Sequence, residues 1–269
     1  MIADWDDAYA NGAHIPGGAG WPDLEAPRLY RAAFAPGRLR EGIAYGRHPR
    51  DRIDLFLPEG RPEGLLIFVH GGYWCEFDRG AWSQYAAGAL GRGWAVAMPG
   101  YALAPEVRVA AITRSIGAAV LRAADLVAGP IVLAGHSAGG HLVTRQVCAD
   151  SSLTGEVLER LRRVVSISGL HDLRPLLATK LNSVLRLDRA QAAAESPALL
   201  WPLPGVAVHA WVGDAERPEF VRQTTLLANV WTGLGAEMAQ TIVAGHHHFS
   251  VIDPLTDPES DLVAALLGD

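Results

Sequence analysis

The stretch IVLAGHSAGGHL, residues 131–142, carries the clearest structural signal in the chain. Its first residues, Ile131–Leu133, form a short apolar run typical of a buried strand, and the segment from His141 onward has helical periodicity. Between them lies the pattern Gly-x-Ser-x-Gly, whose two glycines permit a tight turn from a strand into a helix. We therefore predict that Ser137 is presented on this turn as a nucleophile.

The alternation of strand and helix continues on both sides of this turn. Short β-branched runs alternate with longer helical segments, which predicts a mostly parallel central sheet with helices on both faces. The expected strands are Leu65–Val69, Trp94–Met98, Ile131–Ala134, Val164–Ile167, Val206–Val212 and Gln240–Val243. The expected helices are Arg79–Leu90, Val109–Leu126, Ala138–Cys148, Pro218–Trp231 and Ser260–Leu267. The alternating run Ile53–Leu57 is expected to be an antiparallel edge strand.

We interpret the chain as a single domain, residues 1–269, because it contains no internal repeat and no linker. A chain of 269 residues that is 49% hydrophobic can bury a substantial core. Residues 1–36 and 172–200 interrupt the rhythm of strands and helices. We expect these two segments to form a small cap over the site.

Charge and cysteine content narrow the class of protein. The net charge of −6 gives no basic surface for nucleic acid, and no apolar run is long enough to span a membrane. Cys75 and Cys148 are too few for a disulfide framework or a zinc site, so we expect no metal and no cofactor. We expect a cytoplasmic protein that acts on a small molecule. The oligomeric state stays open, and a homodimer is one alternative.

A second glycine-rich turn, HGGYW at residues 70–74, follows the predicted strand Leu65–Val69. Consecutive glycines let the backbone approach a ligand and direct its N–H groups toward it. Acyl transfer needs such donors for the negative charge that develops on the carbonyl oxygen. The candidate oxyanion-hole residues are Gly71, Gly72, Tyr73 and Ala138. The rings of Tyr73 and Trp74 either stack on a substrate or pack the cap against the sheet, and the sequence leaves both alternatives open.

Two loops after predicted strands supply candidates for a base and an acid. A serine hydroxyl becomes a good nucleophile when a histidine takes its proton and a carboxylate orients that histidine. The segment GDAE at residues 213–216 offers Asp214 and Glu216, and GHHHF at residues 245–249 offers three histidines. Three adjacent histidines suggest a metal site, but we expect one of them to act as a base instead, because successive side chains in a loop diverge. The residues alone leave the choice between Asp214 and Glu216 open.

Several motifs in this order resemble the kynurenine formamidase (arylformamidase) family, in the hormone-sensitive-lipase-like branch of the α/β hydrolases. The resemblance covers roughly residues 50–255. Its motifs are HGGYW at 70–74, YALAPEV at 101–107, GHSAGGHL at 135–142 and SGLHDLRPL at 168–176. It implies the α/β-hydrolase fold and a serine hydrolase that works through an acyl-enzyme on a formamide such as N-formylkynurenine, or on a small acyl ester.

The resemblance also selects the acid and the base. The family's acid follows its strand as G-x-x-D before P-E-F, which corresponds to Glu216, with Asp214 as the alternative. Glutamate in place of aspartate is a departure from the family pattern. The family pattern G-x-x-H-F implies that the base is His248. Competing interpretations are a general carboxylesterase or thioesterase and, from a different class, a non-catalytic binding module on a hydrolase scaffold.

Overall fold

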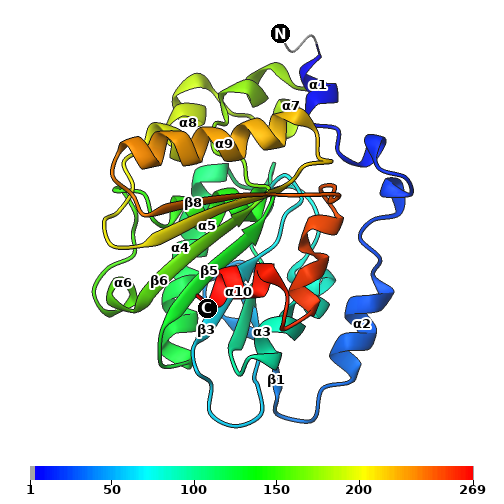
Figure 1. Ribbon diagram of the computed structural model, residues 1–269, viewed down its shortest axis with the longest axis vertical. Helices are drawn as coiled ribbons and strands as arrows, with labels where there is room; N and C mark the ends of the chain where they lie inside the picture. Colours follow the sequence, from blue (N-terminus) through cyan, green and yellow to red (C-terminus); the bar gives the residue numbers. More distant parts are fainter. Residues whose placement is uncertain (1–3, 269) are drawn as a thin grey trace.

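A central eight-stranded sheet organises the computed structural model, which describes residues 4–268 (Figure 1). The strands are β1 (Leu39–Ala44), β2 (Arg52–Phe56), β3 (Leu65–Val69), β4 (Ala95–Pro99), β5 (Ile131–His136), β6 (Leu161–Ile167), β7 (Ala207–Gly213) and β8 (Met238–Val243). Their order in the sheet is β1-β2-β4-β3-β5-β6-β7-β8. Among the eight strands of this sheet, only β1–β2 and β2–β4 pair antiparallel, so the predicted mostly parallel sheet is confirmed.

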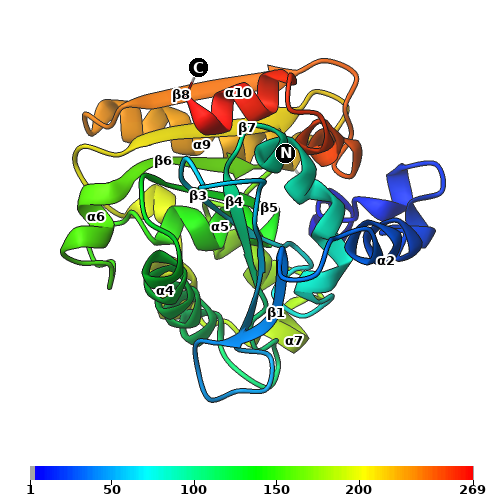
Figure 2. The same cartoon turned by 90° about the horizontal axis from the view of Figure 1, so that it is seen from below.

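Helices connect the strands and cover both faces of the sheet. The α-helices are α1 (Trp5–Ala8), α2 (Glu25–Ala32), α3 (Ala87–Gly91), α4 (Val109–Leu126), α5 (Ala138–Arg145), α6 (Glu156–Arg160), α7 (Asn182–Leu185), α8 (Arg189–Ala194), α9 (Pro218–Gly233) and α10 (Asp261–Leu267). The 3-10 helices are η1 (Gly12–His14), η2 (Gly18–Gly20), η3 (Arg79–Ala86), η4 (Arg174–Ala178), η5 (Pro197–Leu199) and η6 (Ser250–Thr256). In Figure 2, α4 lies on one side of the central strands and α2 on the other.

The core has two layers, one on each face of the sheet. Successive side chains of a strand point to opposite faces, so a doubly buried strand is apolar at every position. In β3, Leu65 and Ile67 pack in one cluster with α4, α5 and α9, whereas Leu66 and Phe68 pack in the other with η3 and α10. This accounts for the continuous apolar runs in the sequence.

Three elements differ from the sequence-based prediction. The run Ile53–Leu57 forms the antiparallel β2, but β2 lies inside the sheet, because the unpredicted β1 occupies the edge. β1 carries the polar sequence LREGIA, and none of its residues is fully buried, so it has no apolar run to reveal it. The predicted helix Arg79–Leu90 is split into η3 and α3. Trp82 and Tyr85 of η3 are both buried, and their spacing of three residues matches the 3-10 turn.

The two segments expected to form a cap meet where α1 of the first contacts η4 of the second. The first runs along one side of the sheet, blue in Figure 1, although its residues 1–3 lie outside the described residues. The second, residues 172–200, holds η4, α7 and α8, and the backbone N–H of Lys180 donates to Asp6 of the first segment. Within residues 4–268, no helix combines the length and apolar character that crossing a bilayer requires.

Candidate active site

Ser137 occupies a strained turn between β5 and α5. Its φ of 57° is unusual for a residue with a side chain, and strain of this kind is concentrated at functional sites. A Cβ at Gly135 would lie 2.2 Å from the carbonyl oxygen of Gly139, and one at Gly139 would lie 1.9 Å from that of Val69. Only glycine fits at these two positions. The Gly-x-Ser-x-Gly pattern is therefore required by the close packing of this turn.

Strand register brings the HGGYW turn to the serine. β3 pairs in parallel with β5 so that Val69 faces Gly135, and the residues that follow each strand are therefore neighbours. A Cβ on Gly71 would lie 3.0 Å from the Cβ of Ser137. The candidate oxyanion-hole amides, those of Gly71, Gly72, Tyr73 and Ala138, donate no hydrogen bond to any other described residue. Unused donors thus lie beside the candidate nucleophile.

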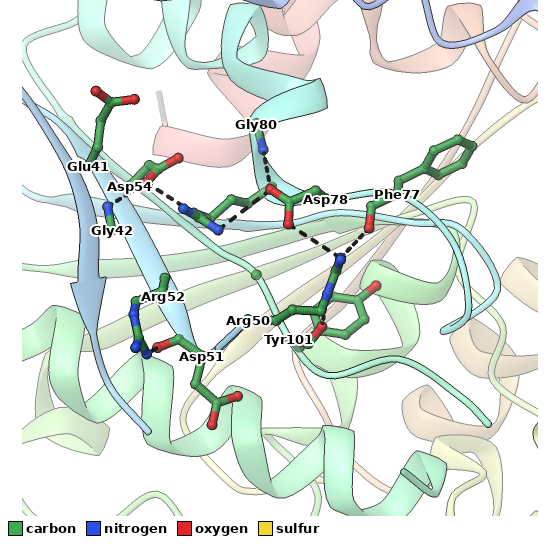
Figure 3. Close-up of polar contacts among 12 residues, drawn as sticks. Glu41, Gly42, Arg50, Asp51, Arg52, Asp54, Phe77, Asp78, Gly80 and Tyr101 are labelled. Carbon is green, nitrogen blue, oxygen red and sulfur yellow. Dashed lines mark hydrogen bonds and ion pairs between the residues drawn. The ribbon is translucent and has the colours of Figure 1, made fainter. Parts of the chain in front are cut away.

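The backbone of this turn is also strained. Tyr73, Trp74 and Phe77 all have left-handed φ values, of 46°, 60° and 69°. Arg50 supports the turn from behind: its Nε donates to the carbonyl oxygen of Tyr101 at 2.9 Å, and its Nη2 donates to that of Phe77 (Figure 3). A turn with this many strained residues persists only where its surroundings hold it.

Two stacked rings hold the start of the same turn. The Tyr101 hydroxyl donates to the carbonyl oxygen of His70 at 2.9 Å, and the two rings stack at 4.3 Å between centroids. Burial lowers the pKa of His70 to about 4, so this imidazole is neutral near pH 7. His70 therefore supports the backbone of the turn as a neutral ring.

Below this turn, the buried carboxylate of Asp54 on β2 joins several elements (Figure 3). It forms ion pairs with Arg31 at 2.9 Å and with Arg79 at 3.0 Å, and it accepts from the backbone N–H of Gly42 at 2.8 Å. Arg79 directly follows Asp78, which itself pairs with Arg50 at 3.4 Å. The turn is thereby connected to the inner antiparallel strand through a network of charged groups.

The structure pairs Glu216 with His248. The Nδ1 atom of His248 lies 2.6 Å from Glu216 Oε2, and both residues are buried. Glu216 Oε1 accepts from the hydroxyl of Ser168 and from the backbone N–H of Gly213 at 3.0 Å. The exposed Asp214 instead accepts from the backbone N–H of Gly245 at 2.7 Å. Glu216, and not Asp214, is thus the carboxylate beside the imidazole.

Ser137 and His248 line the same cavity of about 310 Å³. The Oγ atom of Ser137 makes no hydrogen bond to any residue from 4 to 268. In unliganded sites the hydrogen bond from nucleophile to base is often formed only when substrate binds. The carboxylate contact on Nδ1 leaves Nε2 of His248 as the atom able to accept a proton.

Aromatic rings from distant parts of the chain line this cavity. Trp21 and Phe249 stack in parallel with 4.1 Å between ring centroids, and Trp21 meets Trp82 edge-on at 5.0 Å. Trp21 and Trp82 belong to no motif, so no sequence pattern marks them as site residues. His136 and Phe249 stand in the motifs GHSAGGHL and GHHHF, but neither had been assigned a role. Among the described residues that line this cavity, the ionisable side chains are those of Glu76, two histidines and two tyrosines.

Of the two aromatic residues in the HGGYW turn, only Tyr73 lines the cavity. Trp74 is fully buried, and its Nε1 donates to Nδ1 of His141 at 3.2 Å. This position favours the packing alternative for Trp74. His136, which precedes the serine, donates from Nε2 to the carbonyl oxygen of His248 at 2.8 Å, and burial lowers its pKa well below the usual value.

The fold is that of an α/β hydrolase, and the comparison with family models agrees. The model of the alpha/beta hydrolase family matches residues 66–267, so the chain belongs to that family. Among curated proteins, kynurenine formamidase of Danio rerio is 27% identical over 84% of this chain and 79% of its own length. Kynurenine formamidase of Drosophila melanogaster is 25% identical over 82% of this chain and 78% of its own length.

Solved structures extend the comparison. A candidate thioesterase from Silicibacter sp. is 49% identical, with a TM-score of 0.94 over 98% of this chain and 99% of its own. Esterase B of Lactobacillus rhamnosis has a TM-score of 0.70 at 19% identity, over 98% of this chain and 93% of its own, which supports the fold alone. The expected α/β-hydrolase fold and the resemblance to kynurenine formamidases are confirmed.

Proposed function

We propose that this chain is a serine hydrolase in which Ser137 is the nucleophile, His248 the general base and Glu216 the acid that orients it. The observation that carries the proposal is the Glu216–His248 contact of 2.6 Å beside the cavity that Ser137 lines. The buried carboxylate holds the proton on Nδ1 and stabilises the imidazolium that forms during reaction. The proposed base and nucleophile line the same cavity.

The mechanism follows from this arrangement. His248 Nε2 takes the proton of Ser137 Oγ as that oxygen attacks the substrate carbonyl carbon. The negative charge that develops on the carbonyl oxygen is held by the free amides of Gly72, Tyr73 and Ala138. The leaving group takes the proton from His248 and departs, which leaves an acyl-enzyme. A water molecule, activated by the same histidine, then hydrolyses this ester and restores the serine.

An aryl formamide such as N-formylkynurenine is our first choice of substrate. Two features support it: the curated relatives named kynurenine formamidase, and a cavity of about 310 Å³ walled by Trp21, Trp82 and Phe249. Aromatic walls favour an aryl leaving group, because rings pack well in offset or edge-on arrangements. We further propose that the N-terminal segment acts as a cap, since Tyr9 and Asn11 also line this cavity.

A small acyl ester or thioester is the second candidate, and the 49% identical relative described as a candidate thioesterase favours it. The test measures kcat/KM for N-formylkynurenine, p-nitrophenyl acetate and a small acyl thioester on the same preparation. We expect efficient turnover of the formamide. Preference for either ester by orders of magnitude would refute the formamidase assignment and retain the hydrolase mechanism.

The matched control for the mechanism is Ser137→Ala. Because the serine serves chemistry rather than packing, this variant should lose activity on all three substrates and keep the melting temperature of the parent. Turnover comparable to that of the parent would refute Ser137 as the nucleophile.

A further inference from the structure

A buried asparagine in the N-terminal segment borders both cavities that reach His248. Asn11 lies between α1 and η1 and is only 6% exposed. It lines the cavity of Ser137 and also a neighbouring cavity of about 240 Å³ that includes Glu216 and His248. Asn11 has no role in the proposed mechanism, although it lines the same cavities as the reacting groups.

The amide of Asn11 is only half satisfied. Its Nδ2 approaches the Tyr73 hydroxyl at 3.5 Å, the limit for a hydrogen bond, and its Oδ1 is buried without a partner among residues 4–268. Buried polar atoms without partners are rare in folded proteins and call for an explanation. Because Asn11 lines the cavity of Ser137, a substrate that supplies a donor would explain this unpaired acceptor.

The orientation of this amide follows from its neighbours. The Tyr73 hydroxyl donates its hydrogen to the carbonyl oxygen of Tyr9 at 2.6 Å, so its oxygen can only accept from Asn11. The NH2 group of Asn11 must therefore face Tyr73, which leaves Oδ1 as the free acceptor. A flipped amide would place two acceptors against each other.

The segment that carries Asn11 is held in place on both sides. The Tyr9 hydroxyl donates to Glu219 Oε1 at 2.7 Å, and Asp7 forms an ion pair with Arg217. The backbone N–H of Asn11 donates to Tyr9, and its carbonyl oxygen accepts from the backbone N–H of His14 at 3.0 Å. Asn11 is thus a preorganised group and not a mobile surface side chain.

We propose that Asn11 Oδ1 accepts a hydrogen bond from the N–H of the scissile amide and makes the site selective for formamides over esters. This inference rests on the proposed function and specifies its substrate class. An amide carries an N–H on its leaving group, whereas an ester oxygen carries no hydrogen. Only the amide can satisfy the free acceptor.

A hydrogen bond from the substrate N–H to Asn11 Oδ1 would assist the cleavage of an amide. When Ser137 Oγ adds to the formyl carbon, the nitrogen lone pair must turn toward the protonated Nε2 of His248. The N–H then points away from His248, and an acceptor on that side stabilises the arrangement. The C–N bond breaks, its electron pair stays on nitrogen, nitrogen takes the proton from His248, and the formyl group remains on Ser137.

The test uses two substrates that differ only at the leaving atom, formanilide and phenyl formate. For Asn11→Ala, we expect kcat/KM for formanilide to fall about tenfold or more, mainly in kcat, because the lost bond matters most in the transition state. For phenyl formate we expect a change of less than about threefold, since an ester never pairs with Oδ1. The decisive quantity is therefore the ratio of kcat/KM for formanilide to kcat/KM for phenyl formate.

Two further variants separate recognition from structure. Tyr73→Phe removes the hydroxyl that orients the Asn11 amide, so it should lower the rate for formanilide more than that for phenyl formate, in the same direction as Asn11→Ala. Asn11→Asp keeps an acceptor at the same place once the Tyr73 hydroxyl turns its hydrogen from Tyr9 to the second carboxylate oxygen, so it should restore part of the amide-to-ester ratio that Asn11→Ala loses. If Asn11→Ala lowers both rates equally, Asn11 is only structural and this inference is wrong. If the parent protein hydrolyses neither formanilide nor N-formylkynurenine, the formamidase assignment itself fails.

Discussion

Replacing Glu216 by glutamine is a sharp test of the acid, because its surroundings dictate how the new amide must sit. Ser168 and the backbone N–H of Gly213 both donate to Oε1, so the glutamine oxygen will take that side. The NH2 group then faces Nδ1 of His248, where the carboxylate lies at 2.6 Å in the parent. Nδ1 must become an acceptor, and the ring proton moves to Nε2.

A histidine with its proton on Nε2 cannot take one from Ser137. Loss of the correct tautomer costs about 10³- to 10⁴-fold in kcat when the geometry stays intact. We expect a loss of that size for Glu216→Gln, measured as steady-state kcat on the best substrate at pH 7 to 8. Circular dichroism and the melting temperature check that the fold is retained.

The matched control is Asp214→Asn, two residues away in the same loop. Asp214 is exposed and accepts one backbone N–H from Gly245, which an asparagine oxygen can also do. Its activity should stay within about threefold of the parent, as for most surface changes. A larger loss with Asp214→Asn than with Glu216→Gln would refute the assignment of the acid.

Three further predictions follow from the geometry. Gly71→Ala places a Cβ 2.9 Å from the carbonyl oxygen of His136, so the turn must shift and kcat should fall about 100-fold or more; an unchanged kcat would show that these amides do not hold the oxyanion. Ser168→Ala removes one donor from Glu216 and should lower kcat about tenfold with little change in KM, whereas a change in KM alone would contradict the positioning role. Burial lowers the pKa of His141 to about 3 from the usual 6.5, so the unfolded chain binds a proton there that the folded protein does not. His141 should therefore lower the free energy of unfolding by about 1.4 kcal/mol for each pH unit as the pH drops from 6.5 toward 3. When the free energy of unfolding is measured by urea denaturation and plotted against pH, His141→Gln should reduce the slope by that amount, and an unchanged slope would contradict this prediction.

The sequence predicted the parts of the fold that depend on short-range constraints. The buried strands were recognisable because both faces are covered, which makes β3 and β5 apolar at nearly every position. The turn at Ser137 was recognisable because only glycine fits on either side of it. The edge strand β1 was missed, since an edge strand with exposed residues needs no apolar pattern.

The site was predictable only in part, because it is assembled from residues that lie far apart in the chain. The residues alone could not choose between Asp214 and Glu216, because the choice depends on how the loop turns after β7. The aromatic walls come from Trp21, Trp82 and Phe249, which lie far apart in the chain and meet only in three dimensions. Asn11 stood in a segment without periodicity, and its free acceptor becomes visible only when every neighbouring atom is placed.

The most direct test of the mechanism is labelling with a fluorophosphonate, which reacts with serines that are activated by a neighbouring histidine. Peptide mass spectrometry should locate the adduct on Ser137 at one label per chain. Glu216→Gln should slow the labelling sharply, and Ser137→Ala should abolish it. An adduct on another residue, or no adduct on a protein that hydrolyses its substrate, would contradict the account.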